Sequence, residues 1–133
     1  MASLQFNWES CYELGIKEID DQHKKLVGIF NKLAKAFLAQ KTKHALSEIL
    51  IELNQYADYH FQAEEKFFAE NKLNDMKDHI QEHKNYMFKM KQFEETNNQG
   101  INIDFSLLSF LKRWWSDHIL VSDKDYAKKV KST

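Results

Sequence analysis

The chain contains no proline, and this absence limits the folds it can adopt more than any other feature of the sequence. At an average usage of about 5%, a chain of 133 residues would carry about six or seven prolines. It also has only three glycines, so it lacks the residues that form most turns between short strands. All-β and doubly wound α/β folds are therefore disfavoured, and one domain made of a few long helices is expected.

The apolar residues recur every three or four positions, which is the period of an amphipathic α-helix. Leu26, Phe30, Leu33 and Phe37 show this spacing in the first such segment. The pattern predicts helices over about residues 20–40, 43–70, 74–95 and 104–121, after an arm at 1–18 and before a short C-terminal tail. Such helices with short connections are typical of an up-down-up-down four-helix bundle. We therefore expect residues 1–133 to form one all-α domain.

The charges nearly balance, with 19 Lys and Arg against 20 Asp and Glu, so no basic surface for nucleic acid is expected. No run approaches the ~18 consecutive apolar residues that a membrane span needs. Cys11 is the only cysteine, and the first residues lack the basic start and apolar run of a signal peptide. These features predict a cytoplasmic protein that binds neither nucleic acid nor membrane, and we expect it to be a monomer.

Polar residues fill the gaps in the apolar stripes of all four helices. They are His23, His60, Glu64, His79, His83 and His118. With a rise of about 1.5 Å per residue, their depth in the bundle can be compared by counting from the connections. His23 lies 18 residues before Lys41 and His60 lies 19 after it, so both are about 27 Å from that connection. The same count from the other connections places all six residues in one layer.

Imidazoles and a carboxylate buried together in an apolar core indicate a metal site, because a bound cation offsets the cost of burying them. The pairs His60/Glu64 and His79/His83 each place two ligands on one helical face. Five nitrogens and a carboxylate exceed what one four-coordinate zinc takes, so two ions are expected. Ligation rich in imidazole suits iron, copper, zinc or nickel better than magnesium or calcium.

Asp123 is the next acidic residue after His118, five positions further on. On a regular helix it would point about 140° away from His118. Asp123 can therefore join the site only if the helix bulges or ends near Leu120 to Ser122. Spacing alone leaves its participation open.

The sequence resembles the hemerythrins, specifically the single-domain bacterial hemerythrins. The matching features are Trp8 and the segments YELGIKEIDDQH (12–23), HFQAEE (60–65), H-x3-H (79–83) and WWSDHILVSD (114–123). The resemblance implies a non-haem di-iron centre that binds O2 reversibly. By the same resemblance, His79, His83 and His118 would hold one iron, His23 and His60 the other, and Glu64 and Asp123 would bridge the two together with an oxo or hydroxo group.

The resemblance also implies an O2 pocket lined by Leu26, Phe61, Trp115 and Ile119. The family commonly has leucine where this chain has Trp115, so the larger ring is expected to narrow the pocket. Few anionic ligands and an apolar pocket favour O2 binding over oxidation chemistry. We therefore expect a protein that stores O2 or delivers it to an oxygen-requiring enzyme, and not an enzyme itself.

Other functions are less consistent with the sequence. Residues 79–83 also match the H-x-x-E-H pattern of some zinc proteases, with Glu82 as the base, but a protease would leave three buried histidines unexplained. Ferritin-like oxidases use a Glu-x-x-His motif, which this chain lacks. O2 sensing, or peroxide or oxidase chemistry at the same centre, remains the alternative. His44 is expected on the surface, and Glu65 is expected to face outward or to contact a ligand.

Overall fold

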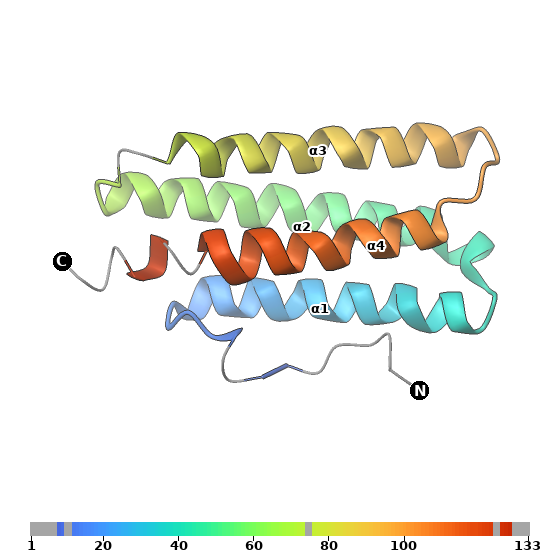
Figure 1. The fold of residues 1–133 in the computed structure, drawn as a ribbon, viewed down its shortest axis with the longest axis horizontal. Helices are drawn as coiled ribbons and strands as arrows, with labels where there is room; N and C mark the ends of the chain where they lie inside the picture. The colour runs from blue at the N-terminus through green and yellow to red at the C-terminus, as the bar shows by residue number, and fades with distance from the viewer. Residues whose placement is uncertain (1–7, 10–11, 74–75, 124–125, 129–133) are drawn as a thin grey trace.

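The computed structural model describes residues 8–9, 12–73, 76–123 and 126–128. Four long helices lie side by side: α1 (Lys17–Leu38), α2 (Thr42–Glu70), α3 (Lys77–Asn98) and α4 (Asp104–Trp114), which continues as the π-helical segment η2 (Trp115–Asp123). Figure 1 shows them as an antiparallel bundle in which α1 packs against α2 and α4, and α2 packs against α3. The described residues contain no β-strand, and the all-α bundle expected from the sequence is confirmed.

The helix bounds differ from the expected ones mainly at the ends. α1 begins at Lys17, inside the segment expected to be an arm, and α3 extends to Asn98. The expected start of the third helix at 74–75 lies outside the described residues, as do most of the arm and the tail. The last helix keeps α geometry only to Trp114 and then widens.

Each of the three connections between the helices contains a residue with a left-handed backbone conformation just after the helix end, so the helices end without proline. Gln40, Lys72 and Gly100 have φ values of 56°, 56° and 80°. In each case the next residue donates its N–H to a carbonyl five positions earlier, as Lys41 does to Ala36 at 2.9 Å. This is the hydrogen bond of a Schellman motif, which satisfies the free carbonyls of a helix end. Gln40 and Lys72 adopt this conformation although only glycine does so without strain.

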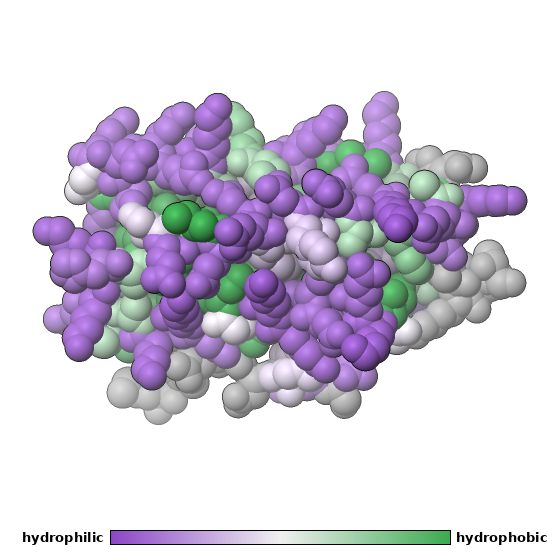
Figure 2. Space-filling view, turned by 180° about the vertical axis from the view of Figure 1, so that it is seen from behind, coloured by the Kyte–Doolittle hydropathy of each residue, from purple (hydrophilic) through white to green (hydrophobic). Residues whose placement is uncertain are grey.

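The core consists of two apolar clusters. The larger one lies between the four helices and contains the completely buried residues Leu33, Ile49, Leu53, Met90 and Leu107. The smaller one includes Phe68 and Tyr126. The face of the molecule shown in Figure 2 is mostly hydrophilic, and its apolar areas are small and separate. None of the helices in the described part of the chain is long and apolar enough to cross a membrane. Some large apolar side chains, such as Phe88 and Phe105, are exposed, but the interior of the bundle is apolar, so the polar groups that lie inside it need a separate explanation.

Candidate metal centre

Seven buried polar side chains meet in one layer of the bundle, and every helix contributes to it. α1 provides His23; α2 provides His60 and Glu64; α3 provides His79 and His83; and η2 provides His118 and Asp123. All seven are at most 5% exposed. Six of them are the residues that the helical spacing singled out, and the seventh, Asp123, was implied only by the family resemblance; the structure brings all seven together. His44, the sixth histidine, is exposed.

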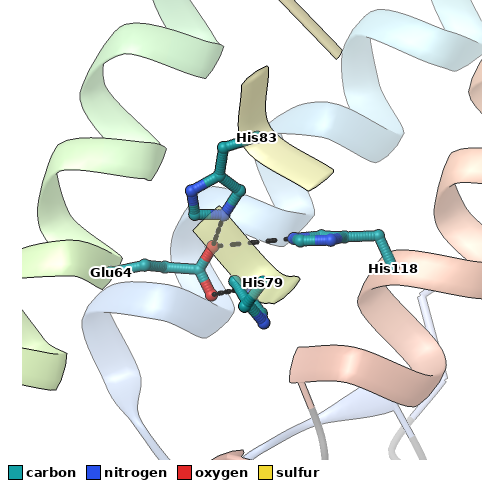
Figure 3. A group of neighbouring side chains, drawn as sticks. All are labelled: Glu64, His79, His83 and His118. Atoms are coloured by element: carbon teal, nitrogen blue, oxygen red, sulfur yellow. Dashed lines mark hydrogen bonds and ion pairs between the residues drawn. The ribbon is translucent and has the colours of Figure 1, made fainter. Parts of the chain in front are cut away.

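The seven side chains form two groups. Glu64, His79, His83 and His118 can each direct one ligand atom into a common space, with these atoms within 4.8 Å of one another. Figure 3 shows the three imidazoles of this group converging on the Glu64 carboxylate. The second group, His23, His60 and Asp123, meets the same criterion. The division into three and two histidines follows the assignment that the family resemblance implies.

The two carboxylates lie between the groups. Asp123 places Oδ2 at 2.9 Å from His23 Nε2 and Oδ1 at 3.0 Å from His79 Nε2 and 3.2 Å from His118 Nε2. Glu64 places Oε1 at 3.0 Å from His60 Nε2 and 3.1 Å from His83 Nε2. Each carboxylate therefore reaches imidazoles of both groups, which is the position that a bridging ligand requires.

The π-helical segment η2 explains how Asp123 reaches the site. A π-helix forms i→i+5 hydrogen bonds, so its turns are wider than those of an α-helix and residues five apart lie on nearly the same face. His118 and Asp123 are five apart, and both point into the layer. The irregularity expected near Leu120 to Ser122 is present, but it begins earlier, at Trp115, and continues to Asp123. Within α-helical geometry the two side chains would diverge.

The chemistry of this donor set fits metal ions. His79 Nε2 and Asp123 Oδ1 are 3.0 Å apart, yet neither makes a hydrogen bond to a described residue. The same is true of three further inward atoms: His60 Nε2, His118 Nε2 and Glu64 Oε2. Buried polar atoms are rarely left without partners. These atoms are instead aimed at shared points between them, as the ligand atoms of an ion are.

The electrostatics of the site keep its carboxylates ionised. Burial and the nearby charge of Glu64 raise the pKa of Asp123, but His118 and His23 outweigh both and hold that pKa well below its usual range. Burial lowers the pKa of His60, yet the charges of Glu64 and Asp123 outweigh burial and raise it to about 9. Without metal, the raised pKa values of His60, His79 and His118 favour protons on these rings, and their charge balances the carboxylates. Metal binding must displace such protons, because a coordinating Nε2 needs its lone pair.

Two contacts behind the ligands were not expected from the sequence. Gln22 Oε1 makes a short hydrogen bond with His60 Nδ1, and Glu82 Oε2 lies 3.0 Å from His118 Nδ1. Such contacts fix the orientation of metal-binding imidazoles. The only feature of the sequence that points to these two residues is their position, since Gln22 and Glu82 directly precede ligand histidines. Each of them, however, contacts a histidine on another helix. Glu65 lies 3.8 Å from His83 Nδ1, beyond hydrogen-bonding distance.

Apolar and aromatic side chains enclose the polar layer. Phe61 stacks on His83 with ring centroids 3.9 Å apart, and Trp114 stacks on His118 at 4.0 Å. Trp115 meets His23 edge to face at 6.1 Å. The four residues expected to line an O2 pocket, Leu26, Phe61, Trp115 and Ile119, are all at most 5% exposed. Phe61 also borders a cleft of about 360 Å³ between α2 and α3 that reaches His83.

Comparison with known proteins defines the class of this chain. Residues 14–130 match the family described as the hemerythrin HHE cation-binding domain. A bacteriohemerythrin of Clostridium acetobutylicum is 33% identical over 130 residues, covering 91% of this chain and 98% of the relative. A hemerythrin-like protein of Naegleria gruberi is 29% identical over 121 residues, covering 91% and 90%, and a bacteriohemerythrin of Pseudomonas aeruginosa is 28% identical over 125 residues, covering 93% and 80%.

The fold and the buried donor set are those of a helical-bundle protein with a cation-binding core. The chain belongs to the hemerythrin family, and its sequence is similar to the bacterial members over most of its length.

Proposed function

We propose that this protein binds O2 reversibly at a non-haem di-iron centre. His79, His83 and His118 hold one iron, and His23 and His60 hold the other. Glu64 and Asp123 bridge the two ions together with an oxo or hydroxo group. The observation that carries the proposal is the unequal division of the five imidazoles between two groups that share both carboxylates.

The unequal division gives the centre an open side. When bound, the iron pair supplies the electrons that hold O2, and the ion with two histidines has fewer protein ligands than its neighbour. Trp115, whose ring lies 6.1 Å from that of His23, and Leu26 are almost fully buried, and we propose that they restrict this side of the centre to a small ligand. An apolar enclosure admits O2, which is itself apolar, and excludes ions that would compete for the same position.

The enclosure also supports binding in preference to oxidation chemistry. Leu26, Phe61, Trp115 and Ile119 carry no acidic proton that could promote the release of peroxide. Glu64 and Asp123 are the only carboxylates among the seven ligands, so little negative charge is available to stabilise highly oxidised iron. We therefore propose a binding protein that stores O2 or delivers it to an oxygen-requiring enzyme, and not an enzyme.

All seven ligands come from a single chain, so the centre needs no second copy, and we propose a cytoplasmic monomer. Size-exclusion chromatography with light scattering tests the oligomeric state. A stable dimer would contradict this part of the proposal, and the assignment of the metal ligands would be unaffected.

The test of the function is metal analysis combined with absorption spectra recorded before and after deoxygenation. The proposal predicts two irons per chain and a visible band that appears with O2 and disappears without it. Exposed His44 supplies a matched control, because His44→Ala should leave both the iron content and the band unchanged. One zinc per chain and a featureless spectrum would refute the proposal.

A further inference from the structure

The Nδ1 atoms of the ligand histidines, which face away from the centre, have unequal partners. His118 Nδ1 lies 3.0 Å from a carboxylate oxygen of Glu82, whereas His60 Nδ1 meets the neutral amide oxygen of Gln22. His23 Nδ1 and His83 Nδ1 make no hydrogen bond to a described residue. Of these four Nδ1 atoms, only that of His118 therefore has a carboxylate of a described residue as its hydrogen-bond partner.

Glu82 reaches His118 across the bundle. It lies on α3 next to the ligand His83, and its side chain crosses to η2, where His118 lies within the π-helical segment. The Glu82 side chain is 36% exposed, while that of His118 is 1% exposed. The carboxylate thus stays partly in water and its oxygen meets a buried ring. This contact also gives Glu82 of the H-x-x-E-H motif a role that needs no protease activity.

The chemistry of imidazole sets the consequence of this contact. A histidine that binds metal through Nε2 carries its proton on Nδ1, and that N–H then donates to Glu82. A carboxylate accepts the proton more strongly than an amide does, so the ring gains negative character and becomes a more basic ligand. His118 Nε2 points inward, 3.2 Å from Asp123 Oδ1, and makes no hydrogen bond to any residue that the structure describes. The ring is therefore oriented from behind and open in front.

We propose that Glu82 is a positioning residue of the metal centre: it holds the Nδ1 proton of His118 and makes this imidazole a stronger donor than His60. The proposal rests on the metal centre inferred above. Its consequence is electronic asymmetry, because a third carboxylate acts on the side of the three-histidine ion, whereas His60 on the other side has only an amide. The three-histidine ion should therefore favour the ferric state more strongly than its neighbour.

Two substitutions of Glu82 separate charge from hydrogen bonding. Glu82→Gln keeps an acceptor and removes the charge, and Glu82→Ala removes both. Partners of this kind typically change metal affinity by about 10- to 100-fold. For Glu82→Ala we expect the metal-free protein, titrated with Co2+ alone, to bind one of its two ions about tenfold more weakly. Both variants should also raise the midpoint potential of the iron-loaded protein, by about 59 mV for a tenfold loss of preference for the ferric ion in a one-electron step.

Glu65→Gln is the matched control. This substitution also removes one carboxylate charge, at 3.8 Å from His83 Nδ1, but the two residues share no hydrogen bond there. The midpoint potential should therefore shift much less than in Glu82→Gln. Gln22→Glu is the reciprocal variant, and by placing a carboxylate behind His60 it should lower the potential. Nitrogen NMR of the zinc-loaded protein should find His118 protonated at Nδ1.

The outcomes distinguish the two proposals. Equal shifts in the midpoint potential for Glu65→Gln and Glu82→Gln, or an unchanged potential in both Glu82 variants, would overturn the role of Glu82 while leaving the proposed centre intact. Binding of fewer than two Co2+ ions by the unaltered protein would instead contradict the proposed centre.

Discussion

Trp115→Leu tests how the protein controls access to its centre. The Trp115 ring is 3% exposed and lies between His23, at 6.1 Å, and two aromatic residues of the N-terminal segment, Tyr12 at 5.2 Å and Trp8 at 6.2 Å. Of these three neighbours of Trp115, only His23 is a proposed ligand. Replacing the ring by leucine therefore widens the space beside the two-histidine group and leaves every donor atom in place.

The structural cost can be worked from these contacts. A buried Trp→Ala change costs about 3–5 kcal/mol, and leucine keeps part of the lost volume. Each lost aromatic pair is worth about 0.5–1.5 kcal/mol beyond the buried area. We expect a loss of about 2 kcal/mol in the free energy of unfolding, which lowers the Tm by roughly 6–10 °C in a chain of this size. The variant should still fold and bind two irons.

The functional effect is expected in the rate of O2 association. If the indole ring contributes even about 1 kcal/mol to the entry barrier, its removal accelerates association about fivefold, as measured by stopped-flow absorption. Leu107→Ala is the control. Leu107 is fully buried about two helical turns before Trp115, and its replacement by alanine should lower the free energy of unfolding by a comparable amount, about 2–5 kcal/mol. Association and autoxidation rates that equal those of the unaltered protein would show that Trp115 only fills the core.

Two further predictions concern the backbone and the charges of the site. Inserting one alanine between Leu120 and Val121 should place the Asp123 carboxylate six positions after His118, about 120° away from it on an α-helix, so helix content by circular dichroism should persist while bound iron falls to one ion or none; full iron content would show that the five-residue spacing within the π-helical segment is dispensable. In the metal-free protein the pKa of His60 is raised from 6.5 to about 9, so the stabilisation from this protonated ring is complete below pH 6.5 and is lost as the pH rises through 9. Urea unfolding of protein treated with a chelator should therefore show lower stability at pH 9.5 than at pH 6, and equal stability at both values would contradict the charge balance described for the site.

The fold could be predicted from the sequence because the helical period is local and constant. The recurrence of Leu26, Phe30 and Leu33 defines a buried stripe whatever the rest of the chain does. The shared depth of His23 and His60 followed from the rise per residue, which holds as long as the helices are regular. The end of the second helix at residue 70 was predicted correctly. The ends of α1 and α3 were less accurate: α1 stops at Leu38, before Gln40, whose left-handed conformation its residue type does not announce, and α3 continues to Asn98.

The parts that spacing could not supply depend on contacts between helices. Asp123 reaches the layer through a π-helical segment, and no residue type in that segment requires this geometry, so only the family resemblance pointed to it. Glu82 and Gln22 lie beside the ligand stripes and contact histidines on other helices. Their partners are set by how the helices are rotated against one another, which a period within one helix does not determine.

The most direct test of the central claim is a crystal structure of the iron-loaded protein with anomalous scattering measured at the iron edge. We predict two peaks in the buried layer, one bound by His79, His83 and His118 and the other by His23 and His60, with Glu64 and Asp123 contacting both. A single peak, or a peak that leaves either carboxylate outside its coordination, would contradict it.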